Sequence, residues 1–333
     1  MSQLMALDGN MKEKRGLSIG NLIPWIAVAA LLAVAPYIVN AALVSFLFFF
    51  LMWVALSQSF NLFTGLTGYV NFGFVVFYGL GGYGMTLSLL RLNLPIYLAL
   101  LVGGLIAAAF AMVVSLPVLR LRGAYFAIAM LSLAQAVFVI FDNWNFVNSA
   151  TGYTIPVQYY NPQLQYYAML VIAAATCLAV YLVMHSKLGL ALRAIKQNEE
   201  AAVSLGVNST LYKSITLAIS GFFAGLAGGA AIWAITIIDP PSAFDTTVTL
   251  TVISMTMLGG FGTLLGPIIG SAILYSVEYY LGLTYPYLHL IIFGAIIIGT
   301  VLAMPHGIMG VLREYFLKGR VARATEEEIK VKE

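Results

Sequence analysis

The sequence AIKQNEEAAVSLGVN, residues 194–208, is a charged segment in the middle of a very apolar chain. Apolar runs of about 20 residues or more, the length that a spanning helix needs, lie on both sides of it. The segment is too short and too charged to cross a bilayer. Its residues favour helix, and Gly206 and Asn208 favour a helix end. The pattern predicts a helical loop between two membrane spans, formed by one helix or by two helices with a bend near Asn198.

The composition of the chain requires lipid as its main solvent. Of its 333 residues, 61% are hydrophobic and 9% are charged, and the mean hydropathy is +0.95. A soluble domain carries about 25% charged residues. A globule of this length cannot hide so much apolar surface from water. We therefore predict an all-α polytopic membrane protein.

About ten segments are apolar enough to be membrane spans. They are roughly residues 22–39, 42–62, 74–90, 96–117, 123–141, 164–184, 211–238, 246–258, 267–283 and 287–304. The segment 246–258 is too short to cross alone, so we expect its flanks to extend it or other helices to bury it. The predicted transmembrane domain covers residues 22–312, between polar segments at 1–21 and 313–333.

Positive charge predicts the orientation, because Lys and Arg are enriched in cytoplasmic loops. The basic residues fall into four groups: Lys12, Lys14 and Arg15; Arg120 and Arg122; Lys187, Arg193, Lys196 and Lys213; and Arg313, Lys318, Arg320, Arg323, Lys330 and Lys332. Ten spans starting from the cytoplasm place all four groups on the cytoplasmic side. Both termini and the loop 185–213 are therefore predicted to be cytoplasmic, with Arg91 as the exception.

Two glycine-rich segments interrupt the apolar pattern. We call NLFTGLTGYVNFG (61–73) the first break and MLGGFGTLLGPIIG (257–270) the second break. Their candidate structural glycines are Gly65, Gly68, Gly73, Gly259, Gly260, Gly262 and Gly266. Non-helical backbone at membrane depth indicates a transport pathway, whereas small residues also allow close helix packing. Both interpretations stay open for the first break, and packing or a cytoplasmic turn is favoured for the second.

Polar residues inside apolar spans are costly, so they indicate candidate pathway positions. The set is Gln58, Asn61, Tyr69, Asn71, Ser132, Gln135, Thr247, Thr251 and Ser254. Together they predict a weakly polar lining of a translocation pathway. The alternative for any single member is a hydrogen bond between helices.

Several function classes lack the residues that they require. The single cysteine excludes an intrachain disulfide, and the three histidines are isolated, so no metal site is predicted. The net charge of +3 does not indicate nucleic-acid binding. The sequence has no phosphate-binding loop pattern and no nucleophile constellation. We predict a non-catalytic chain, so energy for uphill transport must come from a partner or an ion gradient.

The loop carries the pattern E-A-A-x-x-x-G at Glu200, Ala201, Ala202 and Gly206. Further strings extend the match in order: NLFTGLTGYVNFGFVVFYGLGGY (61–83), LRLRGAYFAIAMLSLA (119–134), FAGLAGG (223–229), GGFGTLLGPIIG (259–270) and PHGIMG (305–310). With them the chain resembles the permease subunits of the branched-chain amino-acid (Liv) importers, among them the LivM-like subunit. These importers belong to the ATP-binding-cassette (ABC) class.

The resemblance implies a permease subunit in the cell membrane. It implies a second related permease, two cytoplasmic ATPases that hold ATP and Mg²⁺, and an extracytoplasmic substrate-binding protein as partners, besides membrane lipids. The loop residues implied to couple to the ATPases are Arg193, Glu199, Glu200, Ala201, Ala202 and Gly206. No cofactor is implied in this chain itself.

The implied substrates are branched-chain or other small hydrophobic amino acids. The chain departs from the family pattern at Tyr69, Phe74, Ala124 and Thr251. Urea and short-chain amides therefore stay open as alternative substrates. An ion-coupled secondary transporter is a further alternative, in which Glu278 would be the intramembrane carboxylate.

Overall fold

The computed structural model describes residues 31–285, 291, 294–295, 298–299 and 307–310. The predicted segments 1–21 and 313–333, the first part of the span 22–39 and most of the span 287–304 lie outside the described residues. The chain divides into two compact units, Met1–Phe46 and Leu47–Glu333. In the first unit, residues 31–38 are helical and the helix α3 begins at Ala41.

The described part of the chain is mainly helical. Its longer helices are α3 (Ala41–Phe60), α4 (Val75–Arg91), α5 (Ile96–Val118), α6 (Ala124–Asn143), α7 (Pro162–His185), α8 (Lys187–Gln197), α10 (Ser209–Ile235), α12 (Thr246–Gly259) and α13 (Gly266–Thr284). Shorter elements are η1 (Asn61–Gly65), η2 (Asn145–Val147), η3 (Ser149–Thr151), η4 (Val157–Tyr159), α9 (Glu199–Ser204) and α11 (Pro240–Ala243). These elements confirm the predicted helical class.

Five stretches of the described residues are long and apolar enough to cross a membrane. They are Ala41–Gly65, Ile96–Val118, Ala124–Asn143, Pro162–His185 and Ser209–Ile235. The helix α12 has 14 residues, fewer than the roughly 20 that a span needs, and most of its second half is buried. A multi-pass membrane protein follows from these helices, whereas the number ten stays a prediction.

Glycines bring three helices of the second unit into close contact. A Cβ at Gly81 of α4 would lie 2.2 Å from the backbone of Gly225 in α10. A Cβ at Gly103 of α5 would lie 2.4 Å from the carbonyl oxygen of Gly81. Because the hydrophobic effect does not drive association in lipid, close backbone packing of this kind holds such helices together.

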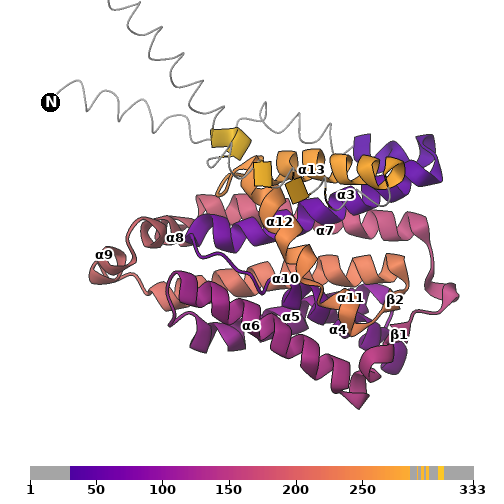
Figure 1. Cartoon of the computed structure of the whole chain (residues 1–333), viewed down its shortest axis with the longest axis horizontal. Coiled ribbons are helices and arrows are strands. Elements are labelled where there is room, and N and C mark those ends of the chain that lie inside the picture. The colour runs from indigo at the N-terminus through magenta and orange to yellow at the C-terminus, as the bar shows by residue number, and fades with distance from the viewer. Residues whose placement is uncertain (1–30, 286–290, 292–293, 296–297, 300–306, 311–333) are drawn as a thin grey trace, which may run out of the picture. The chain divides into compact units, whose positions relative to one another are not determined.

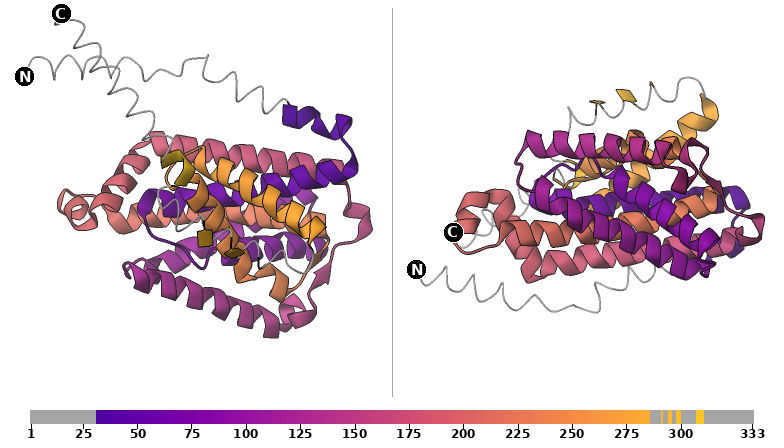
Figure 2. Two further views of the ribbon diagram at one scale, coloured as in Figure 1. Left: turned by 45° about the horizontal axis from the view of Figure 1, so that its top comes forward. Right: turned by 90° about the horizontal axis from the view of Figure 1, so that it is seen from below.

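The charged loop and the only strand pair of the described residues lie at opposite ends of the second unit (Figure 1). The strands β1 (Tyr153–Thr154) and β2 (Ile237–Ile238) pair antiparallel, with Tyr153 opposite Ile238. In two further views, α8 and α9 again lie at the end of the unit opposite to β1 and β2 (Figure 2). At the strand end, Arg91 donates to the carbonyl oxygen of Phe146 at 2.5 Å and to the hydroxyl of Tyr153 at 2.7 Å.

Both glycine-rich breaks are turns at the ends of helices. In the first break the chain stays helical through Thr67, first in the π-helical turn η1, so the irregular part is narrower than predicted, at residues 68–74. A hydrogen bond from the Thr67 hydroxyl to the carbonyl oxygen of Phe63 accompanies this extension. In the second break α12 ends at Gly259 and α13 begins at Gly266. The second break is thus a turn with close packing, as favoured from the sequence.

Candidate functional site

The loop 185–213 is built from two short helices and the start of a third. Ser186, Asn198 and Asn208 cap the N-termini of α8, α9 and α10 by accepting from Gly189 N–H, Ala201 N–H and Leu211 N–H. Such caps satisfy backbone donors that a helix start leaves unpaired. The two-helix version of the loop, with its bend at Asn198, is therefore confirmed.

The helix α9 ends in a Schellman motif. Gly206 N–H donates to the carbonyl oxygen of Val203 at 2.9 Å, and Val207 N–H donates to that of Ala202 at 3.0 Å. The motif requires a left-handed residue at its centre, and Gly206 has φ of 87°. A Cβ at Gly206 would meet nothing within 4 Å, so its conformation, and not crowding, favours glycine here.

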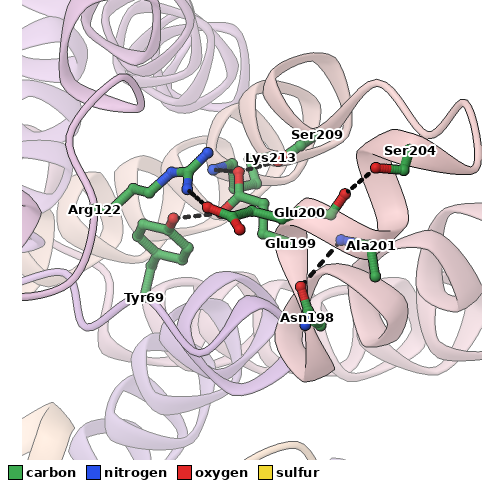
Figure 3. A network of polar contacts seen from close by, with 9 residues as sticks. All are labelled: Tyr69, Arg122, Asn198, Glu199, Glu200, Ala201, Ser204, Ser209 and Lys213. Atoms are coloured by element: carbon green, nitrogen blue, oxygen red, sulfur yellow. Dashed lines mark hydrogen bonds and ion pairs between the residues drawn. The ribbon is translucent and has the colours of Figure 1, made fainter.

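The carboxylate of Glu199 is the centre of a polar network (Figure 3). It accepts a hydrogen bond from the Tyr69 hydroxyl at 2.5 Å and an ion-pair hydrogen bond from Nζ of Lys213 at 2.6 Å. The Ser209 hydroxyl also donates to it. The Lys213 ammonium lies 4.4 Å from the centroid of the Tyr69 ring. The network thus joins α9, the first turns of α10 and the first break.

Burial and hydrogen bonding act in opposite directions on the pKa of Glu199. Partial burial raises the pKa of this carboxyl group, while hydrogen bonds from Lys213, Ser209 and Tyr69 lower it and outweigh burial. The pKa of Glu199 is therefore below its ordinary value. Burial, and then the hydrogen bond to Glu199, raise the pKa of the Tyr69 hydroxyl. Glu199 is the anion and Tyr69 the neutral donor at neutral pH.

The neighbouring Glu200 has a different environment. Its Oε1 pairs with Nη1 of Arg122 at 2.7 Å, and the two side chains are 79% and 60% exposed. The hydrogen bond that Arg122 donates to Glu200 is the largest cause that raises the pKa of Arg122. An exposed pair of this kind contributes little to stability, because water and salt screen it. Glu200 is therefore free to exchange its partner at small cost.

The outer surface of α8 and α9 mixes charge with exposed apolar side chains. Leu190, Val203 and Leu205 are exposed, Leu205 to 86%. Arg193 is exposed, and its guanidinium donates to the carbonyl oxygen of Met184 at 2.7 Å. Ala201 is exposed and Ala202 is buried. The predicted coupling residues therefore divide into an exposed set, with Glu200 and Arg193, and two less accessible residues, the half-buried Glu199 and the buried Ala202.

The candidate pathway residues do not form one lining in this chain. Gln58, Asn61, Asn71, Thr251 and Ser254 are buried, Tyr69 is half-buried, and Ser132, Gln135 and Thr247 are exposed. Gln58 and Asn61 contact the second break, and Tyr69 contacts Glu199. Ser132 and Gln135 lie on the side of α6 opposite its buried residues. A lining role for any of these residues stays a prediction.

Close contacts and unusual backbone angles occur at the predicted structural glycines. Gly68, Gly260 and Gly262 have positive φ angles of 80°, 116° and 74°. A Cβ at Gly73 would lie 2.2 Å from the carbonyl oxygen of Met130, and one at Gly259 would lie 1.8 Å from that of Gly266. A side chain at Gly73 or Gly259 would therefore collide with backbone atoms, which cannot move aside without a large cost in free energy.

Three residues of the polar contacts around Glu199 and Glu200 are not predicted as site residues by the sequence. Lys213 and Arg122 enter the sequence prediction only as members of the basic groups, and no sequence pattern singles out Ser209. A usable signal was present for Lys213, because a lysine at the start of a long apolar helix needs an acidic partner when it is buried. In the described part of the chain, no group of three His, Cys, Asp or Glu residues could hold a metal ion.

Long apolar helices with a charged two-helix loop at one end define a multi-pass membrane protein. The chain matches the family model described as "Branched-chain amino acid transport system / permease component" over residues 42–301, and it belongs to this family. It is therefore a permease component of a transport system and a multi-pass integral protein of the cell membrane.

Two relatives are both named high-affinity branched-chain amino acid transport system permease protein LivM. The protein from Escherichia coli (strain K12) is 25% identical over 342 aligned residues, which cover 93% of this chain and 78% of the relative. The protein from Salmonella typhimurium (strain LT2) is 26% identical over 302 residues, which cover 81% of this chain and 69% of the relative. The chain is similar to both along most of its length.

Proposed function

We propose that the chain is one of two permease subunits of an ATP-driven importer for branched-chain amino acids. The observation that carries the proposal is the family match over residues 42–301. The names of the two relatives support branched-chain amino acids as the substrates. A second permease, two cytoplasmic ATPases with ATP and Mg²⁺, and a binding protein outside the cell would complete the importer.

The orientation belongs to the same proposal. In it, ten spans cross the membrane, both termini are cytoplasmic, and the end that carries α8 and α9 faces the cytoplasm. Lys187 and Arg193 lie in α8, and Arg122 pairs with Glu200 of α9. Asp142 lies in the last turn of α6, and Asp239 follows β2 at the strand end. This distribution supports the orientation, because positive charge is enriched in cytoplasmic loops. The segments 1–21 and 313–333 would be cytoplasmic flanks of a permease domain at 22–312.

The exposed surface of α9 would be the docking site for an ATPase subunit. Glu200 offers a carboxylate whose present partner Arg122 is also exposed, and Val203 and Leu205 offer apolar contact. A mixed polar and apolar surface of this kind suits a protein partner. When the ATPases close around ATP, they would displace α8 and α9. This displacement would favour one of two conformations, in which the pathway is open to the outside or to the cytoplasm.

The pathway would follow the boundary with the second permease. Ser132 and Gln135 lie three residues apart on an uncovered face of α6, a helix with only four buried residues. Polar side chains on a face that met only lipid would be costly, so a protein or water-lined surface fits them better. Weak polar contacts there would suit the passage of a zwitterion with an aliphatic side chain.

Reconstitution with the ATPases, the second permease and the binding protein tests the function. We expect ATP-dependent uptake of leucine, isoleucine and valine above that of urea and short amides. Preferential urea or amide uptake would replace the proposed substrates. Uptake that needs an ion gradient instead of ATP, and that E278Q abolishes, would overturn the importer itself.

A swap of charges tests the docking role of Glu200. The variant E200K should reduce uptake and ATPase association while the chain still inserts in the membrane. The double variant R122E/E200K restores an internal pair with reversed polarity. If docking is what Glu200 serves, the double variant stays impaired. Recovery in the double variant would assign the loss to the internal pair and overturn the docking role.

A further inference from the structure

The two glycine-rich breaks contact each other through the side chain of Asn61. Its Oδ1 accepts from Gly262 N–H at 2.7 Å, and its Nδ2 donates to the carbonyl oxygen of Thr263 at 2.8 Å. One turn earlier, Nε2 of Gln58 donates to the carbonyl oxygen of Leu264 at 2.5 Å. The Asn61 amide therefore both donates a hydrogen bond to this turn and accepts one from it, as neighbouring strands do. The two bonds together fix the position of the turn.

This contact is tight as well as polar. A Cβ at Gly65 would lie 2.0 Å from Oδ1 of Asn61 and 2.7 Å from Gly262 N. Asn61 is fully buried. Separating the breaks would leave the buried Asn61 amide and the partly buried Gly262 N–H without partners, and each such group costs free energy. The turn between α12 and α13 therefore has to follow the end of η1 when that end moves. We call Asn61, Gly65, Gly262 and Thr263 the junction.

Lys196 of α8 contacts the junction from the loop side. Its Nζ donates to the carbonyl oxygen of Gly65 at 2.8 Å. In a continuing helix, Tyr69 N–H would donate to this carbonyl oxygen of Gly65. It donates instead to Oγ1 of Thr67 at 3.2 Å, so the Gly65 carbonyl lies at the end of the helix. A cation at a helix C-terminus is favoured by the unpaired carbonyl groups there.

The stem and the head of Lys196 have different surroundings. The residue as a whole is exposed, while a Cβ at Gly68 would lie 3.4 Å from its Cγ, so the stem crosses the bare backbone of the first break. Desolvation by burial lowers the pKa of Lys196. The ammonium is also near the second break, 3.7 Å from where a Cβ at Gly262 would be.

Apolar packing connects the same three segments. Leu192 is fully buried on α8, one turn before Lys196, in a cluster with Leu62 and Leu66 of the first break. Leu264 of the second break packs against this cluster. Because this packing does not depend on Lys196 or Asn61, it is an independent observation that α8 and both breaks form one contact surface.

We infer that Lys196 and Asn61 are positioning residues that carry a displacement of α8 and α9 to the turn between α12 and α13. The inference rests on the proposed function, in which the ATPases move α8 and α9. Lys196 holds the end of η1 to α8, and Asn61 holds that end to the turn. The helix α12, which carries Thr251 and Ser254, then moves with the loop.

Hydrogen exchange of the full-length chain in lipid nanodiscs, with any subunits that co-purify, tests the connection. K196M removes the ammonium and keeps the length of the side chain. We expect it to speed exchange in residues 259–266 by about threefold or more, in the range that coupled sites show. K196R, which keeps a donor, should resemble the unmodified chain. K187M removes an exposed charge from the same helix and is the matched control. No change in 259–266, or an equal change in K187M, overturns the inference.

A double-variant cycle tests the role of Asn61. N61A should itself speed exchange at residues 259–266, whereas N143A, which loses only a bond within its own helix, should not. In the N61A background K196M should add nothing, because both changes interrupt the same chain of contacts. An undiminished effect of K196M there would overturn the route through Asn61. If N61A does not fold, the comparison of K196M with K187M still decides the first step.

Transport separates this inference from the proposed function. In the reconstituted importer, K196M should lower the substrate moved per ATP hydrolysed by about threefold or more, while ATP hydrolysis continues. Unchanged stoichiometry overturns a role of Lys196 in transport. Absence of any ATP-dependent uptake with the unmodified chain overturns the proposed function, whereas the exchange result still reports on the connection within the chain.

Discussion

The Tyr69 hydroxyl donates a 2.5 Å hydrogen bond to the carboxylate of Glu199, 130 residues further along the chain. The same carboxylate pairs with Lys213, whose side chain is 1% exposed. In the proposed function the loop transmits the movement of the ATPases, so it needs a fixed attachment to the rest of the chain. Glu199 provides that attachment, and it leaves its neighbour Glu200 at the surface.

The two adjacent glutamates should therefore differ in their effect on stability. E199Q removes the anion that faces a buried ammonium, and loss of one partner of a buried pair costs about 3–5 kcal/mol. The Glu199 side chain is 16% exposed, so water can partly replace the lost partner. We therefore expect E199Q to lower the free energy of unfolding by about 3 kcal/mol, the lower end of that range. E200Q should cost about 0–1 kcal/mol. Thermal unfolding in detergent measures both, and equal shifts for the two variants would contradict the structural distinction.

The contribution of Glu199 should depend on pH with a defined sign. The pKa of its carboxyl group is lowered in the folded chain. The stabilisation is thus complete above the unfolded value near 4.3 and is lost as the pH falls through the folded value. The difference in stability between the unmodified chain and E199Q should be constant from pH 7 to about 5 and shrink at lower pH. A difference that grows on acidification would contradict the lowered pKa.

These two glutamates also mark the limit of prediction from the sequence. Spans such as 96–117 and the helical loop were predictable because apolar length, helix propensity and caps such as Asn198 act within a few residues. Which glutamate is buried depends on Tyr69 and Lys213, which lie in other elements. The junction likewise joins Asn61 to Gly262, 201 residues apart. No sequence pattern connects such positions, so the sequence leaves both a pathway lining and a hydrogen bond between helices open for them and does not identify the partner.

The junction predicts that Gly65 does not tolerate alanine. Helix propensity alone would favour G65A by about 0.5–1 kcal/mol. The new Cβ would however lie 2.0 Å from the Asn61 side chain and 2.7 Å from the backbone of Gly262. Overpacking of this kind costs about 1–3 kcal/mol, so we expect net destabilisation in thermal unfolding. The matched control is G282A in α13, where a Cβ meets nothing within 4 Å. If G65A is as stable as G282A, the contact between the breaks is looser than the structure has it.

The end of α9 predicts a graded response at Gly206. G206A meets no steric contact, so it should cost only the left-handed conformation, about 1–2 kcal/mol. G206N should cost less, because asparagine enters that region more easily. G206P fixes φ near −65° and removes the donor to Val203, so it should unwind the end of α9 and reduce ATPase association the most. Hydrogen exchange of residues 199–207 measures the order, and a uniform response of the three variants would contradict the Schellman motif as its cause.

Two candidate pathway residues should respond differently to thiol reagents. In a C177S background, Q135C lies on the uncovered face of α6, whereas N71C replaces a side chain that is 1% exposed. We expect a small membrane-permeant thiol reagent to modify Q135C in the isolated chain, where the outer face of α6 meets detergent, and to leave the buried N71C unmodified there. If the face of α6 meets the second permease, assembly should slow the reaction of Q135C. Reaction of N71C only in the assembled, ATP-bound importer would show that the first break opens during transport. Equal reactivity of both cysteines in the isolated chain would contradict the burial of Asn71.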